Sequence, residues 1–236
     1  MAGAKHRLLA VVNQNGGVRV VAPNKCGHTS VINMFRTRRD KEPESVKLHK
    51  HCRDDFAEWP DALYTLIFFR DPLARAISAF EHFIVRTLRI TTQRGRGHSN
   101  FFHYGLTPEM NFLEYARHLH SIDASCDPHL LPQSDSLLRC GSGKLIAGQL
   151  ERFSEQWPQL VKTLCLDCSD HIEHVNKAYY DINGADYDGY DEAAALIHEV
   201  YAIDYDEYWS YLDEARTPLQ AVSHETLEGA VRLAYK

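Results

Sequence analysis

The sequence lacks any hydrophobic run long enough to cross a membrane. A membrane-spanning helix needs roughly 18 or more consecutive apolar residues, and no segment reaches that length. The N-terminal segment "MAGAKHRLLAVVNQNGG" has too short an apolar part to resemble a signal peptide, because Asn13 and Gln14 interrupt it. We therefore expect no membrane segment and a cytoplasmic location.

A surplus of basic residues and a dense set of cysteines are also lacking. Lysine and arginine number 26 against 32 aspartates and glutamates, which gives a formal net charge of −6. Proteins that bind nucleic acids generally need a basic surface, so we expect no nucleic-acid partner and only a local anion site. The six cysteines are spread along the chain, unlike the disulfide framework of a small secreted domain, and we interpret them as reduced thiols.

The chain contains no internal repeat and no low-complexity tract. Its 236 residues, 44% of them apolar, suffice for one substantial core, so we predict a single domain over residues 1–236. Hydrophobic periodicity predicts strands that alternate with helices, which is typical of an α/β fold with a central parallel sheet flanked by helices. The expected strands are 18–22, 45–51, 62–69 and 144–150, and the expected helices begin near Thr29 and Asp71 and cover 110–119, 153–165 and 190–212.

The segment "VVAPNKCGHTSVINMF" (20–35) places a short polar loop between a predicted strand and a predicted helix. The first backbone N–H groups of a helix have no partner within it, so such a loop is typical of a phosphate site. The ATP-binding motif G-x-x-x-x-G-K-[ST] is absent, because here Lys25 precedes Gly27, Thr29 and Ser30. A different phosphate ligand therefore has to be considered.

A second strand, loop and helix follow in "FFRDPLARAISAF" (68–80). Arg70 ends the strand, Asp71 and Pro72 suit the cap and the first position of a helix, and Ser78 lies two turns further on. Loops at the carboxyl ends of parallel strands line one crevice, and guanidinium and hydroxyl groups are donors to phosphate oxygens. Two phosphate sites in one crevice indicate a nucleotide that is phosphorylated at two positions.

These two segments resemble those of the sulfotransferases that use 3′-phosphoadenosine 5′-phosphosulfate (PAPS), and the likeness is greatest to the carbohydrate-type sulfotransferase family 2. "PNKCGHTSV" is similar to the 5′-phosphosulfate loop of that family, and "FFRDPLARAISAF" is similar to its 3′-phosphate motif. The resemblance spans about residues 18–212, through three further segments: "DPHLLPQ" (127–133), "HVNKAYYD" (174–181) and "VYAIDYDEYWSYL" (200–212).

The resemblance implies a P-loop-like three-layer fold and a PAPS-dependent O-sulfotransferase that releases adenosine 3′,5′-bisphosphate. It implies no metal, and an acceptor hydroxyl, for example of a carbohydrate or a small metabolite. The basic segment 86–109 is expected to be a mobile loop of the kind that selects acceptors. The implied cofactor-binding residues are Lys25, Cys26, Gly27, His28, Thr29, Ser30, Arg70 and Ser78.

Sulfuryl transfer is in-line, so charge develops on the oxygen that bridges to the departing phosphate. Lys25 is suited to meet that charge, and the acceptor hydroxyl needs a general base. His49 and His51 are the preferred candidates, because they share one face of a predicted strand and a His-x-His pair supplies the base in the similar heparan-type 2-O-sulfotransferases. His129 is the second candidate. The other histidines near the loops are interpreted as bystanders: His28, His82 and His103.

Two alternatives stay open: a P-loop kinase that uses ATP, and a non-catalytic relative that binds adenosine 3′,5′-bisphosphate. A zinc site in "CLDCSDHIEH" (165–174) is discounted, because its cysteine and histidine pairs lack the intervening loop of known sites. The segment "CGSGKL" (140–145) is interpreted as a hairpin turn. The identity of the acceptor and the oligomeric state also stay open.

Overall fold

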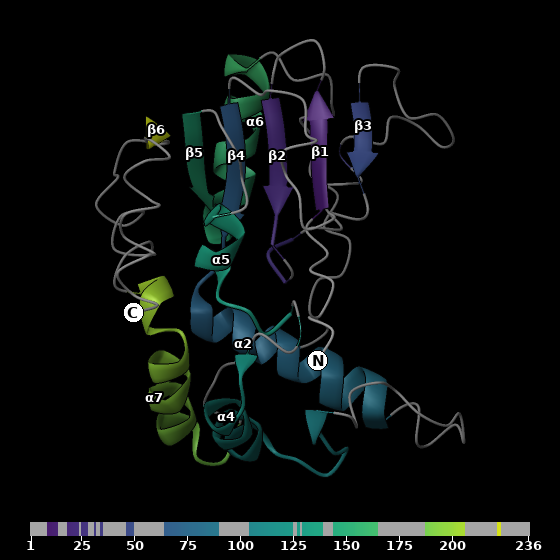
Figure 1. Ribbon diagram of the computed structural model, residues 1–236, viewed down its shortest axis with the longest axis vertical. Coiled ribbons are helices and arrows are strands. Elements are labelled where there is room, and N and C mark those ends of the chain that lie inside the picture. Colours follow the sequence, from purple (N-terminus) through teal and green to yellow (C-terminus); the bar gives the residue numbers. More distant parts are fainter. Residues whose placement is uncertain are drawn as a thin grey trace.

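The computed structural model of the chain places a mixed β-sheet next to a group of helices (Figure 1). The central strands run toward these helices. Because the chain combines a sheet with several helices, its fold is of the mixed α/β kind. The residues that the structure describes, drawn in colour in Figure 1, are 9–13, 18–23, 25–27, 31, 34, 46–49, 64–89, 104–124, 127, 129–138, 144–164, 187–205 and 221–222.

The centre of the sheet is parallel. β2 (Val18–Ala22) pairs with β4 (Tyr64–Phe69), and β4 pairs with β5 (Lys144–Gln149). The side chains of β4 from Thr65 to Phe69 are all buried, which agrees with the continuous apolar run in the sequence. The prediction of a central parallel sheet is confirmed for these three strands.

The flanking strands make the whole sheet mixed. In the described residues the strand order is β3-β1-β2-β4-β5-β6, and β1 (Leu9–Asn13) is antiparallel to both of its neighbours. β3 (Val46–His49) therefore runs in the same direction as β2, and its range lies inside the predicted strand. At the other edge, β6 (Ala221–Val222) is antiparallel to β5.

The helix that follows β4 is continuous through two segments, α2 (Pro72–Phe80) and the π-helical η2 (Glu81–Arg89). Asp71 caps it as predicted, since its Oδ1 accepts a hydrogen bond of 2.8 Å from the Ala74 N–H. The helix extends to Arg89, past the start of the predicted loop 86–109. Residues 90–103 of that loop lie outside the described part of the chain, and residues 104–110 form turns that bury Leu106.

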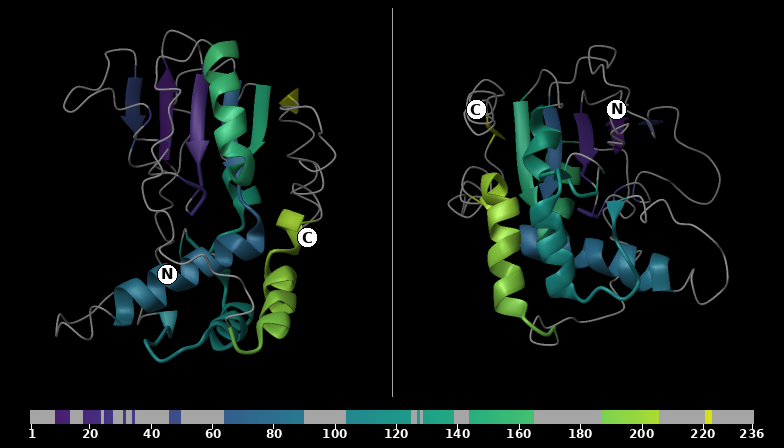
Figure 2. Two further views of the ribbon diagram at one scale, coloured as in Figure 1. Left: turned by 180° about the vertical axis from the view of Figure 1, so that it is seen from behind. Right: turned by 60° about the horizontal axis from the view of Figure 1, so that its bottom comes forward.

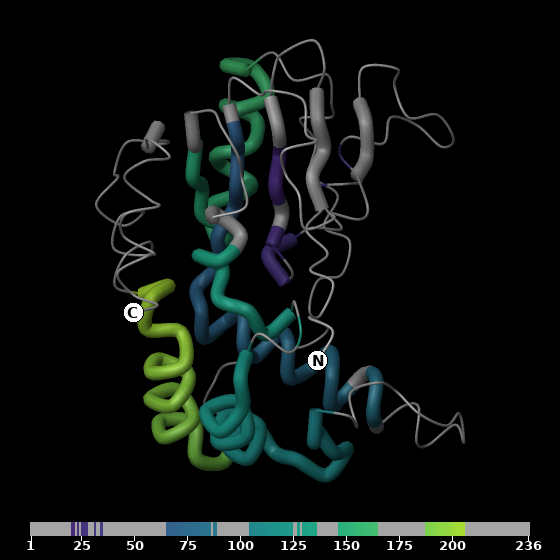
Figure 3. Tube along the Cα trace, in the orientation of Figure 1, coloured from purple at the N-terminus to yellow at the C-terminus, as the bar shows by residue number. Residues whose placement is uncertain are grey.

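The remaining helices surround the carboxyl ends of the parallel strands or cover the sheet. α6 (Phe153–Thr163), preceded by the short η5 (Leu150–Arg152), packs on one sheet face and stands in front of it in the left view of Figure 2. α4 (Phe112–Ser121) and α7 (Tyr190–Val200) lie side by side at the far end of the molecule, as the adjacent traces in Figure 3 show. α6 and α7 fall within their predicted ranges and α4 extends two residues past the predicted 110–119, whereas α5 (Gln133–Leu138) was not predicted.

Two hydrophobic clusters hold these parts together. The first lies between the sheet and α6, where the Phe68 ring packs edge-on against Phe153 at 4.5 Å and Trp157 is fully buried. Val31 and Met34, both helical, belong to this cluster, so the predicted helix after β2 packs on the sheet. The second cluster joins α2, η2, α4 and α7 around Phe80 and Tyr115. None of the described helices is long and apolar enough to span a bilayer.

Candidate functional site

The three parallel strands end at the same edge of the sheet, next to α2 (Figure 1). The loop after β2, residues Arg70 and Asp71 after β4, and η5 after β5 therefore meet there. Gly27 packs so closely on this edge that a Cβ atom would lie 2.7 Å from Leu150 Cδ1. The sequence prediction that the loops after strands 18–22 and 62–69 face one another agrees with this arrangement.

The loop after β2 has an unusual backbone. Lys25 and Gly27 both adopt left-handed conformations, with φ of 67° and 73°. The Cys26 N–H donates to the Pro23 carbonyl at 3.0 Å, and the Val31 N–H donates to the Gly27 carbonyl at 3.0 Å. The second bond has the four-residue spacing of an α-helix, and Val31 and Met34 are helical, so the predicted succession of strand, loop and helix is present in the described residues. His28, Thr29 and Ser30 lie outside the described residues.

Cys26 is held entirely by the protein. Its backbone N–H closes the turn, and its thiol donates to Gln133 Oε1 at 2.8 Å. Burial raises the pKa of this thiol to about 12, which outweighs the nearby positive charges of Arg75 and Arg70. Cys26 is therefore a neutral buried thiol that fixes the shape of the loop.

Arg70 brings the second predicted anion site next to the first. Its Nη1 lies 3.4 Å from the Lys25 carbonyl oxygen, to which it donates. The Lys25 ammonium in turn lies 5.9 Å from the centre of the Phe83 ring, on η2. Two cationic side chains from adjacent strand ends thus share one edge of the sheet. Ser78 lies two turns into α2 and is partly exposed.

Gln133 locks this arrangement. Its amide pairs with both backbone groups of Arg70: Oε1 accepts from the Arg70 N–H at 2.8 Å, and Nε2 donates to the Arg70 carbonyl at 2.7 Å. The same Oε1 accepts the Cys26 thiol proton. The backbone N–H groups of Gln133 and Ser134 both donate to the buried carboxylate of Asp204 at 2.9 Å. The side chain of Gln133 therefore joins the loop after β2 to the end of β4, and its backbone N–H links both to the segment after α7.

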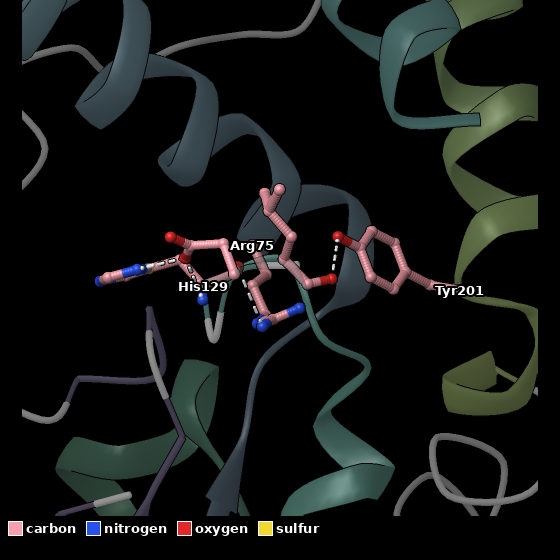
Figure 4. A network of polar contacts seen from close by, with 5 residues as sticks. Arg75, His129 and Tyr201 are labelled. Atoms are coloured by element: carbon pink, nitrogen blue, oxygen red, sulfur yellow. Dashed lines mark hydrogen bonds and ion pairs between the residues drawn. The ribbon is translucent and has the colours of Figure 1, made fainter. Parts of the chain in front are cut away.

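A buried arginine lies behind Gln133. Arg75 is 2% exposed, donates from Nη2 to the His129 carbonyl at 3.1 Å, and lies 5.6 Å from the centre of the Tyr201 ring (Figure 4). The Tyr201 hydroxyl donates to the Leu130 carbonyl at 2.8 Å, so both contacts fasten the segment 129–130. Burial raises the pKa of Asp204, and the positive charge of Arg75 is the largest influence that opposes this rise.

His129 and Asp127 form a hydrogen-bonded pair on the same segment. Asp127 Oδ1 accepts from the His129 backbone N–H and faces the ring nitrogen Nδ1, with both distances 2.7 Å. Burial alone would raise the pKa of Asp127, but these hydrogen bonds outweigh it and hold the pKa below its usual value. The imidazole lies edge-on to Phe83, with ring centres 5.5 Å apart, and stacks on His82 at 6.0 Å. Sequence reasoning ranked His129 second and did not assign a role to Asp127 or Gln133, although all three belong to "DPHLLPQ".

The preferred base candidates lie further along the sheet. His49 is the last residue of β3 and is opposite Ala10 of β1, which in turn is opposite Val21 of β2. It is therefore level with Val21 and two strand spacings away, roughly 10 Å across the sheet. His51 lies outside the described residues, as do His103 and the segment 165–174. Within the described ranges, no group of three histidine, cysteine, aspartate or glutamate side chains is arranged to hold a metal ion.

Comparisons with known proteins add nothing to this geometry. The chain has no significant match among models of protein families, curated proteins or solved structures. Its function has to be inferred from the arrangement of its own residues.

Proposed function

We propose that the protein is a PAPS-dependent O-sulfotransferase, which moves the sulfuryl group of PAPS to an acceptor hydroxyl and releases adenosine 3′,5′-bisphosphate. The acceptor proposed is a carbohydrate or a small metabolite. The finer fold proposed is the P-loop-like three-layer arrangement of this family. Its support is the strand Val18–Ala22, the turn at 25–27 and the helical residues Val31 and Met34, next to a parallel β4 that is followed by Arg70.

The observation that carries the proposal is the contact between Arg70 and the Lys25 loop. Two cationic side chains stand at the ends of adjacent parallel strands, and the Arg70 guanidinium reaches the Lys25 carbonyl oxygen at 3.4 Å. A nucleotide with phosphates on both its 3′ and 5′ positions presents two anionic groups at short range. The pairing of Lys25 with the 5′ end and Arg70 with the 3′ end matches that charge pattern.

The residues at this edge of the sheet suit PAPS, the proposed sulfuryl donor, by their chemistry. Gly27 lets the loop backbone pack directly on Leu150, because a Cβ atom there would lie 2.7 Å from Leu150 Cδ1, and this keeps the loop close to the ends of the parallel strands. Lys25 is a compact positive charge suited to the oxygen between sulfur and phosphate, where PAPS develops charge as its sulfuryl group departs. Arg70 and Ser78 are proposed to hold the 3′-phosphate, and Gln133 keeps Arg70 in place through its backbone.

Two other functions are compatible with an anion loop. A P-loop kinase is disfavoured because Lys25 precedes Gly27, which reverses the order of the ATP motif, and because Arg70 would have no 3′-phosphate to bind. A non-catalytic relative that binds adenosine 3′,5′-bisphosphate shares every feature of the loop and of Arg70. Turnover alone separates that relative from the proposed enzyme.

Thermal unfolding with three nucleotides tests the cofactor class. Adenosine 3′,5′-bisphosphate should raise the Tm well above the effect of ADP or AMP at equal concentration, since a ligand that binds the native state stabilises it. Arg70→Ala should lose most of this selective rise. Arg117→Ala is the matched control, because Arg117 forms an exposed ion pair with Glu192 on α4 and α7 and should retain the full effect. Equal stabilisation by ADP, or an unchanged response in Arg70→Ala, would contradict the two-phosphate argument.

A further inference from the structure

We propose that His129, oriented by Asp127, is the catalytic base that removes the proton from the acceptor hydroxyl. This inference rests on the proposed function and assigns a step of that reaction to residues on the segment before α5. It differs from the sequence-based preference for His49 and His51.

The pair has the geometry that a base needs. Asp127 Oδ1 faces His129 Nδ1 at 2.7 Å, which assigns the proton of the neutral imidazole to Nδ1 and leaves the lone pair on Nε2. Among the described residues Nε2 has no hydrogen-bond partner. The His129 side chain is 28% exposed and that of Asp127 only 11% exposed. The base is thus open to a substrate, while its orienting carboxylate is largely shielded.

Asp127 is itself well held in the ionised form. The same Oδ1 accepts the His129 backbone N–H at 2.7 Å, so the carboxylate contacts both the backbone and the ring of His129. These bonds keep the pKa of Asp127 below its usual value, so the carboxylate is charged at neutral pH and stabilises the imidazolium that forms when His129 takes a proton. Asp127 is a positioning residue in this scheme.

The pair also lies where the reaction requires it. The buried Phe83 ring lies next to both the proposed base and the cation that faces the leaving oxygen. Lys25 Nζ lies 5.9 Å from the centre of this ring, and the centre of the His129 ring lies 5.5 Å from it. In an in-line transfer, one group contacts the leaving oxygen and the base contacts the acceptor oxygen. Two hydrogen bonds of about 3 Å each and the oxygen–sulfur–oxygen unit separate that group from the base. Lys25 Nζ and the His129 ring both lie within about 6 Å of the same ring centre, so their separation is of the same order as that span.

His49 is placed less favourably. Its strand β3 is separated from β2 by β1, and its backbone is level with Val21, four residues before Lys25. His129 instead reaches the loop of Lys25 through a single intervening ring. The backbone of His129 is further fixed by Arg75, which donates to its carbonyl from α2.

The proposed step is balanced as follows. The acceptor oxygen gives its proton to His129 Nε2 while its electron pair forms the new bond to sulfur. The bond between sulfur and the bridging phosphate oxygen breaks, and its electron pair stays on that oxygen, which Lys25 faces. The products are the sulfate ester, adenosine 3′,5′-bisphosphate and the imidazolium of His129, which then loses its proton to water.

The rate should depend on the charge of His129, and four groups face that residue. Asp127 contacts the ring, His82 stacks on it from η2, Arg75 binds its carbonyl from α2, and Lys25 lies across Phe83. Turnover is expected to fall as the pH falls and the imidazole becomes protonated. Asp127→Asn should lower kcat and move this acidic limb to lower pH, because the imidazolium loses its carboxylate partner. Asp127→Glu should recover part of both effects.

The experiment measures binding and turnover separately. Binding is followed by the Tm rise with adenosine 3′,5′-bisphosphate, and turnover by release of that nucleotide from PAPS, with water or a panel of monosaccharides as the acceptor. His129→Gln should keep the Tm rise and lose at least about 100-fold in turnover, the range of general base catalysis. The contact from Arg75 survives in this variant because it uses the backbone. His120→Gln, an exposed histidine paired with Glu199, is the matched control.

The possible outcomes separate this inference from the proposed function. If the wild-type protein shows no Tm rise with adenosine 3′,5′-bisphosphate, or binds it and releases none from PAPS, both the enzyme and its base are overturned. If His129→Gln binds and turns over like the wild type, only the assignment of the base fails. Loss of turnover in His49→Gln with full activity in His129→Gln would transfer the role to β3. An unshifted pH profile in Asp127→Asn would refute the positioning role of Asp127.

Discussion

Replacing Gln133 by leucine tests whether one buried amide holds the candidate site together. Leucine is similar in size, so little cavity is created, but three hydrogen bonds are lost: two to the backbone of Arg70 and one from the Cys26 thiol. A hydrogen bond of this kind contributes about 1 kcal/mol to stability, so the expected loss is about 3 kcal/mol. For a chain of this size each kcal/mol corresponds to about 2–4 °C, and the Tm should fall by about 6–12 °C.

The matched control is Gln156→Leu. Gln156 is also buried, but its side chain makes a single described hydrogen bond, from the Gln149 N–H at 3.0 Å, so the same substitution should cost about 1 kcal/mol. Thermal unfolding followed by circular dichroism measures both variants under one set of conditions. In Gln133→Leu, binding of adenosine 3′,5′-bisphosphate should also weaken, because the Arg70 backbone and the Cys26 thiol lose their shared partner and, of the described side-chain contacts, only the 3.4 Å bond from Arg70 to the Lys25 carbonyl still links the two segments. Equal Tm values for the two variants would show that Gln133 does not have the central role inferred here.

Two further predictions concern the loop after β2 and the buried arginine. Gly27→Ala should destabilise the fold by about 1–2 kcal/mol, because the backbone there is left-handed. The 2.7 Å contact of the new Cβ atom with Leu150 Cδ1 should add a further loss. Urea unfolding measures both losses, and only the contribution of the contact should disappear in a Leu150→Ala background. Arg75→Met should cost about 3–5 kcal/mol at neutral pH because it leaves Asp204 buried without its main compensating charge. The pKa of Asp204 is raised, so the folded state keeps a proton that the unfolded state has lost, and stability falls as the pH rises above the unfolded pKa of about 4. The loss of stability in Arg75→Met should therefore be smaller at pH 4.5 than at pH 7.5. It should also be smaller in the double variant Arg75→Met/Asp204→Asn. An equal loss at both pH values would contradict the buried-charge explanation.

Local elements were largely predictable from the sequence. The strands at 18–22 and 62–69, the cap at Asp71 and the helix that begins at Pro72 appear where periodicity and capping residues place them. Each of these signals comes from residues within one or two turns of each other. The strand at Leu9–Asn13 was missed, because a run of five apolar residues (8–12) followed by a polar run does not distinguish a short strand from an irregular segment.

The residues that hold the candidate site together could not be found in this way. Gln133 meets Cys26 across 107 positions of sequence, and Asp204 meets Gln133 across 71. Gln133 and Asp204 are polar residues in segments whose periodicity says nothing about burial, yet both are buried. The pairing of His129 with Asp127 is local, but its position next to Lys25 depends on Phe83 and therefore on how η2 packs.

The sequence by itself determined the α/β character, the strand–loop–helix units and the two cationic residues, Lys25 and Arg70, that follow the strands at 18–22 and 62–69. These are consequences of short-range order, since apolar spacing, capping and turn residues act between near neighbours. Only the tertiary structure decided that Arg70 reaches the Lys25 loop and that Gln133 joins both to Asp204. It also decided that His129 packs on Phe83, the same ring that Lys25 approaches. Such contacts depend on burial and on the packing of distant segments, and no local pattern encodes them.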